Sequence, residues 1–192
     1  MTEFQELTDA ELIQRCLELR EDGAHQPFEE LYNRHVRVVL AFLRRLLGQD
    51  EHAVLDALQE SFVRLYRALP NFKQDRALRP WLLTIARNVS LDYLKHSSRN
   101  EQCFEQSAMD QLARDSSANE NRQARELEEM LGQALQSLNV DERAIFHLKN
   151  ELELTFEQAS EILGCSVRTA KYRMKAALER LGRELERLGL GV

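Results

Sequence analysis

Basic side chains recur along one face of a helix predicted near the C-terminus. Most are three or four positions apart, which places them on the same side of an α-helix. The basic residues are Arg168, Lys171, Arg173, Lys175, Arg180 and Arg183, and Tyr172 lies among them. Guanidinium and ammonium groups in such a row bind phosphates and, in the DNA major groove, the edges of guanine. An ordinary solvated surface has the same composition, so the assignment depends on the elements around it.

Residues 155–183 are predicted to form two helices joined by a tight turn. The first begins at Thr155, and Gln158 stands at the spacing of a capping box. Gly164 can adopt the left-handed conformation that often ends a helix, and Ser166 can cap the next one. On the second helix the positions expected to face inward are Val167, Ala170, Met174, Ala177, Leu178 and Leu181. These parts are typical of a helix-turn-helix, whose second helix enters the DNA major groove.

Aromatic and basic residues are interleaved in a loop predicted over residues 71–80 and a helix predicted over 81–96. The basic and amide side chains are Arg76, Arg79, Arg87, Asn88, Lys95 and Arg99. Such a mixture suits single-stranded nucleic acid, because bases stack on rings while cations contact phosphates. A buried Trp81 beneath a solvated loop explains the pattern equally well.

Three further helices are predicted upstream, over residues 8–19, 28–47 and 51–69, from apolar positions that recur at three and four. The expected buried side of the third comprises Leu55, Leu58, Phe62, Leu65, Tyr66 and Leu69. Another face of that helix carries Asp56, Gln59, Glu60 and Arg64. His35 is expected to be a packed histidine, since no metal ligand stands at a useful spacing from it.

The composition favours helix throughout. The 192 residues include only 7 Gly and 3 Pro and show no alternating strand pattern, which predicts an all-α protein. No apolar run approaches the ~20 residues of a membrane span, and the N-terminus lacks the order of a signal peptide. We therefore expect a cytoplasmic protein without membrane insertion. The cysteines, Cys16, Cys103 and Cys165, are widely spaced and suit reduced thiols.

The net charge is -6, with an acidic N-terminal region and a basic C-terminal helix. This asymmetry predicts a focused DNA contact together with a protein partner, rather than general coating of nucleic acid.

Several motifs in order resemble a bacterial sigma factor of the extracytoplasmic-function type. They are DALQESFVRLY, then NF, then RPWLLTIARNVSLDYLK, then the helix-turn-helix. The resemblance covers about residues 28–99 and 127–185. It implies two small helical domains joined by a polar linker: a region 2 domain over residues 1–97, a flexible linker over 98–125, and a region 4 domain over 126–192.

The resemblance also implies a function: binding the core of RNA polymerase and directing promoter-specific initiation, in response to an extracytoplasmic or stress signal. The side chains implied to dock on a coiled coil of the largest polymerase subunit are Asp56, Gln59, Glu60 and Arg64. Such factors are usually held inactive by an anti-sigma protein, so an anti-sigma partner is expected.

Two promoter elements are implied as DNA ligands. The minus-ten element would be melted and bound as a single strand. Phe72, Lys73, Arg76 and Asn88 would lie in or near the pocket for an extruded base, and Arg87, Lys95 and Arg99 would contact phosphates. The minus-thirty-five element would be read as a duplex by Arg168, Thr169, Lys171, Tyr172 and Lys175. A glycine is common in the family where Arg168 stands, and an arginine where Ala176 stands, so the promoter sequence cannot be transferred from a relative.

Two alternatives remain at this point. A stand-alone helix-turn-helix regulator explains the C-terminal region but leaves the QESF motif and the aromatic-basic loop without a role. A small hydrolase or metalloenzyme lacks support, because no nucleophile, paired carboxylate or His/Cys group stands at suitable spacing. We therefore expect no catalytic residues, no metal and no cofactor.

Overall fold

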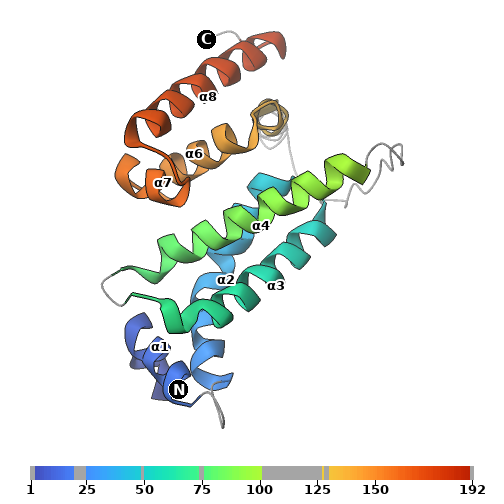
Figure 1. The fold of residues 1–192 in the computed structure, drawn as a ribbon. Helices are drawn as coiled ribbons and strands as arrows, with labels where there is room; N and C mark the ends of the chain where they lie inside the picture. The colour runs from blue at the N-terminus through green and yellow to red at the C-terminus, as the bar shows by residue number, and fades with distance from the viewer. Residues whose placement is uncertain are drawn as a thin grey trace, which may run out of the picture.

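The computed structural model describes residues 3–19, 25–48, 50–73, 76–100, 127 and 130–190 (Figure 1). These residues form helices and turns without any β-strand, which confirms the predicted all-α fold. In chain order the labelled α-helices of the described residues are α1 (Asp9–Glu18), α2 (His25–Leu47), α3 (Glu51–Ala68), α4 (Leu78–Asn100), α6 (Val140–Asn150), α7 (Phe156–Ile162) and α8 (Val167–Arg187). Residues 130–136 are also helical, and short 3-10 turns span Glu3–Glu6 and Leu69–Asn71.

The first half of the molecule is built from α1 to α4. The helices α2, α3 and α4 pack against one another, and α1 packs on α2 (Figure 1). Their facing sides bury leucines completely, among them Leu31, Leu43, Leu65 and Leu82. Removing these side chains from water is the main favourable contribution to folding, since each buried leucine contributes about 1.5–3 kcal/mol.

Several helices begin at side-chain caps that the sequence predicted. In each capping box the cap oxygen accepts from a backbone N–H three residues on, and the acid or amide there accepts from the cap backbone. The boxes are Thr8 with Glu11, Asn139 with Glu142, and Thr155 with Gln158. Ser166 caps α8 as expected, and Gly164 has a φ of 57°, the left-handed conformation predicted for the turn.

The second half packs directly on the first. The helix α6 lies against α2 and α7 lies against α4 (Figure 1). Ile145, Leu148 and Ile162 are fully buried in the same apolar cluster as the leucines of the first half. A smaller cluster joins residues 134–138 to Ala177 and Leu181 of α8. One continuous core therefore holds the two halves in contact.

Some predicted details are wrong. Leu55 is 48% exposed and Leu178 is 51% exposed, although both were expected to be buried. Each leucine lies on the part of its helix surface that no neighbouring helix among the described residues covers. The periodicity of apolar residues does not show how wide the covered part is. The helix predicted over 81–96 spans Leu78–Asn100, because residues 97–100 include no helix-breaking glycine or proline. Residues 101–126, which hold Cys103 and most of the predicted linker, lie outside the described residues.

His35 is packed in the protein interior, as predicted, and it has a partner that the sequence did not indicate. It is 9% exposed, and its Nε2 lies 2.8 Å from Oδ2 of Asp9. Arg34 contacts the other oxygen of Asp9 at 3.3 Å. The hydrogen bond with His35, more than the charges of His35 and Arg34, holds the pKa of Asp9 below its ordinary value of 3.8. This cluster fastens the start of α1 to α2.

We expect Asp9→Asn to lower the free energy of unfolding by about 1 kcal/mol at neutral pH, the typical contribution of one such hydrogen bond. Because the pKa of Asp9 is depressed in the folded state, its contribution is present above the unfolded-state pKa and is lost as pH falls through the folded-state pKa. The variant should therefore lose less stability on acidification than the wild type. Urea unfolding followed by circular dichroism at several pH values measures this. Equal losses in wild type and variant would contradict the assignment, and the exposed Glu29→Gln serves as control.

Candidate functional site

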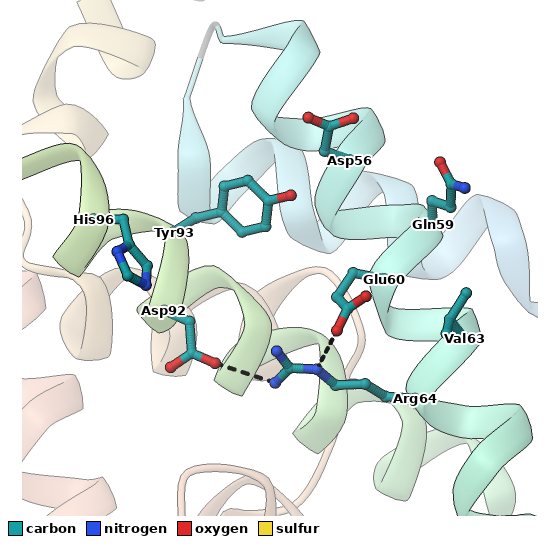
Figure 2. A pocket seen from close by; sticks show the side chains of 8 residues that line it. All are labelled: Asp56, Gln59, Glu60, Val63, Arg64, Asp92, Tyr93 and His96. Carbon is teal, nitrogen blue, oxygen red and sulfur yellow. Dashed lines mark hydrogen bonds and ion pairs between the residues drawn. The ribbon is translucent and has the colours of Figure 1, made fainter. Parts of the chain in front are cut away.

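A groove of about 580 Å³ lies between α3 and α4 (Figure 2). It brings together all four residues predicted to bind polymerase core, which are Asp56, Gln59, Glu60 and Arg64. The groove is completed by Val63 of α3 and by Asp92, Tyr93 and His96 of α4. The i, i+3 and i+4 spacing on α3 explains why the first four share a face. The three contributions from α4 were missed, because nothing in the sequence shows which face of α4 turns toward α3.

Arg64 links the two walls of the groove. Its Nε donates to Glu60 Oε1 at 2.7 Å, and its Nη1 donates to Asp92 Oδ2 at 3.1 Å (Figure 2). These carboxylates raise the pKa of Arg64. The three side chains are each about 40% exposed or more, so the ion pairs contribute only ~0–1 kcal/mol to stability. Their main effect is to orient the two carboxylates along one surface.

The groove is electrostatically negative. It holds the carboxylates of Asp56, Glu60 and Asp92 but only one guanidinium, that of Arg64. Burial raises the pKa of the Tyr93 phenol, and the charges of Asp56 and Glu60 raise it further. A surface with this charge is complementary to a basic partner, which it attracts and orients.

The predicted minus-ten residues lie in two separate places. Phe72, Lys73 and Arg76 belong to the loop before α4, whereas Asn88 and Lys95 lie on α4 itself. Phe72 stacks on Trp81 with ring centroids 4.8 Å apart, so Trp81 packs beneath the loop as expected. Phe72 and Arg76 also line a cavity of about 340 Å³ against the start of α1. Lys73 is exposed beside Phe72, while Asn88 and Lys95 are exposed farther along α4.

Arg87 is not exposed with these residues. Only 11% of its side chain is accessible, and its Nη2 donates to Asp141 Oδ1 at 2.6 Å. Asp141 lies in the first turn of α6, so this predicted phosphate-binding arginine contacts the second half of the molecule instead of solvent. Sequence periodicity could not reveal this partner, which is more than fifty positions away.

The predicted recognition residues lie along the outer side of α8. Arg168, Lys171, Tyr172 and Lys175 are exposed, with Tyr172 at 72%, whereas Thr169 is half-buried beside the cap residue Ser166. The spacing of the four exposed residues places them on one face, suited to entering a groove of duplex DNA. Arg173 differs from its neighbours, because its Nη2 contacts Asp141 Oδ2 at 2.7 Å.

Comparison with known proteins identifies the family. Residues 31–100 match the model of sigma-70 region 2, and residues 128–181 match that of sigma-70 region 4. The ECF RNA polymerase sigma-E factor of Haemophilus influenzae is 28% identical over 192 residues, covering 96% of this chain and 98% of that protein. The RNA polymerase sigma factor CarQ of Myxococcus xanthus is 31% identical over 171 residues, covering 89% of this chain and 96% of CarQ. The chain belongs to the extracytoplasmic-function sigma factor family.

Solved sigma factors share the architecture. CnrH, in complex with the cytosolic domain of CnrY, superposes with a TM-score of 0.62 at 26% identity, covering 93% of this chain and 97% of CnrH. RpoE of Bartonella quintana, solved with the anti-sigma factor NepR, gives a TM-score of 0.65 at 23% identity, covering 83% of this chain and 96% of RpoE. The second likeness concerns the fold alone.

As a sigma factor, the protein is a transcription initiation factor, and its regions 2 and 4 bind RNA polymerase core and promoter DNA. The match to region 2 includes the helix that carries the QESF motif. A stand-alone helix-turn-helix regulator would not account for this helix. Among the helices that the structure describes, none has the length and hydropathy of a membrane span. Within the same residues, no group of three or more His, Cys, Asp or Glu side chains is placed to hold a metal ion.

The electrostatics of the groove can be tested through Tyr93. Replacing Asp56 by Asn removes a negative charge that disfavours the phenolate, so the pKa of Tyr93 should move down toward its ordinary value. Nuclear magnetic resonance of ring-labelled tyrosine measures this titration residue by residue. Glu29→Gln, an equal charge change on the surface of α2, should leave Tyr93 unaffected. An upward shift in the Asp56 variant would contradict the proposed charge distribution.

Proposed function

We propose that the groove between α3 and α4 is the surface through which this sigma factor binds the coiled coil of the largest polymerase subunit. The observation that carries the proposal is the convergence of Asp56, Gln59 and Glu60 with Asp92 in one negatively charged groove. Arg64 holds Glu60 and Asp92 in place, so both helices present acceptors to a basic partner at once. Binding through such a surface depends on charge complementarity, which sets the register of the complex.

The two promoter elements are bound by separate parts of the chain in this proposal. The melted minus-ten strand contacts the loop before α4 and the exposed side of α4, with Phe72, Lys73, Arg76 and Asn88 near the extruded base, and with Lys95 and Arg87 at phosphates. Extruding a base costs a few kcal/mol of stacking, which contacts in a pocket return. The minus-thirty-five duplex is read by the exposed residues of α8, with Arg168, Lys171, Tyr172 and Lys175 at the groove and Thr169 at a phosphate.

The proposal extends to organisation and control. It divides the chain into a region 2 domain over 1–97, a linker over 98–125 and a region 4 domain over 126–192. Tethering two weak DNA contacts in one chain raises the effective concentration of the second. CnrH, which is 26% identical, was solved in complex with the cytosolic domain of CnrY, which supports control by a protein partner here. By family resemblance, this partner is an anti-sigma factor. The protein acts in the cytoplasm on a stress or extracytoplasmic signal, and it catalyses no bond chemistry itself.

We expect the double variant Gln59→Ala, Glu60→Ala to bind purified polymerase core about five- to thirtyfold more weakly. Exposed polar contacts contribute ~0.5–1 kcal/mol each, and about 1.4 kcal/mol corresponds to tenfold. Fluorescence anisotropy with labelled protein measures the dissociation constant. The matched control is Gln14→Ala, Glu18→Ala, an exposed Gln–Glu pair on α1. Equal affinity of the two double variants for core would remove the groove from the interface.

Arg168→Ala and Lys171→Ala should each reduce run-off transcription from the native promoter by about five- to a hundredfold, because one specific base contact contributes ~1–3 kcal/mol of discrimination. Core affinity should stay unchanged. Arg187→Ala, at the far end of α8, removes an equal charge and should leave transcription within about twofold. Wild-type transcription levels in both recognition-helix variants would refute the assignment of α8.

A further inference from the structure

One carboxylate joins two arginines from opposite halves of the molecule. Asp141 Oδ1 accepts from Nη2 of Arg87 on α4 at 2.6 Å, and Oδ2 contacts Nη2 of Arg173 on α8 at 2.7 Å. Asp141 itself belongs to α6. A single side chain in region 4 is therefore bonded both to region 2 and to the helix that carries the recognition residues.

These contacts are better shielded from solvent than a second ion pair that the described residues form between the halves. The side chains of Arg87, Asp141 and Arg173 are 11%, 27% and 27% exposed. The pair of Arg45 with Glu151, by contrast, has exposures of 48% and 38%. Water and salt screen exposed pairs strongly and buried pairs much less. The Arg87–Asp141 pair is therefore the stronger of these two electrostatic links between the halves.

The cluster has more hydrogen-bond donors than its carboxylate can accept. Arg87 Nε and Arg173 Nη1 are both buried and have no hydrogen-bond partner among the residues that the structure describes. Two guanidinium groups share one carboxylate, which leaves one positive charge in excess. Arginine presents several donors in a planar fork that matches the oxygens of phosphate, and a phosphodiester offers an acceptor to each arginine.

We propose that Asp141 is an internal competitor of DNA phosphate. While region 4 is packed on region 2, the carboxylate of Asp141 occupies Arg87, and promoter DNA reaches Arg87 only after the two halves separate. The pair of Asp141 with Arg173 lies within region 4, so separation of the halves does not break it. The idea rests on the proposed function, which assigns Arg87 to the minus-ten strand and α8 to duplex DNA. Separation is compatible with the chain length between Asn100 and Leu127, since an extended chain spans up to about 3.4 Å per residue.

The test uses the full-length protein carrying Asp141→Asn. This variant keeps the size of the side chain but removes the charge that holds both arginines. Binding of the free protein to a promoter fork with a single-stranded minus-ten element, measured by anisotropy at fixed salt, should tighten at least about fivefold relative to wild type. Small-angle scattering should show a larger radius of gyration.

The matched control is Glu51→Gln, which makes the same charge change in the Arg44–Glu51 pair within region 2. Its DNA affinity should stay within about twofold of wild type, as expected for loss of one exposed charge. If Asp141→Asn folds, by circular dichroism, but binds DNA no better than Glu51→Gln, Asp141 is only a structural ion-pair partner and the proposal is overturned.

A second measurement covers the case in which Asp141→Asn does not fold. Saturating wild-type protein with a single-stranded minus-ten oligonucleotide should increase hydrogen exchange at the surface of α6 and α7 that faces α2 and α4. Unchanged exchange at saturation would overturn the proposal. Failure of the proposed assignment to DNA is distinguishable, because Arg168→Ala and Lys171→Ala would then transcribe at wild-type levels, whatever the result for Asp141→Asn.

Discussion

Arg143 fixes the two halves of the molecule by capping two helix ends at once. Its guanidinium donates to the carbonyls of Arg45 and Leu46 at the end of α2, at 3.4 and 3.2 Å. It also donates to the carbonyl of Gln136, the last of the helical residues 130–136, at 3.1 Å, and to that of Leu138 just beyond them, at 3.0 Å. The last carbonyls of a helix have no partner within it, so one side chain satisfies acceptors from both halves. Burial lowers the pKa of Arg143, yet a guanidinium keeps its charge at neutral pH. This contact sets α6 on α2 and thereby decides where Asp141 and α8 lie.

The charges of the molecule are separated in space, which the net value of -6 conceals. The groove between α3 and α4 is negative, whereas the outer side of α8 presents Arg168, Lys171 and Lys175. Between these surfaces, Asp141 neutralises part of the charge of Arg87 and Arg173. A protein that is acidic overall can therefore bind DNA through a local surface, while its general attraction to nucleic acid stays weak. The packing of the two halves strengthens this effect, because it withdraws the guanidinium of Arg87, which separated halves would expose.

The success of the sequence predictions follows the range of the interactions concerned. The cap at Thr155 and the left-handed turn at Gly164 were predicted correctly, since both depend on atoms within a few residues. The face of α3 that carries Glu60 was also recognised from its helical spacing. Asp92 was missed, because its place in the same groove depends on how α4 packs on α3. Leu178 was wrongly expected to be buried for the same reason: the arc that neighbouring helices cover on α8 is a property of the tertiary structure.

Arg87 shows why the role of a residue in this family depends on the arrangement of the two halves. The family resemblance concerns the protein bound to DNA, for which we propose that Arg87 contacts phosphate. In the packed protein the same guanidinium is 11% exposed and bonded to Asp141. Both roles cannot hold at once, since a phosphate reaches Arg87 only by displacing that carboxylate. Arg168 and Lys171 remain exposed in the packed arrangement. If Arg87 acts as proposed, its contact with the melted strand must follow separation of the halves.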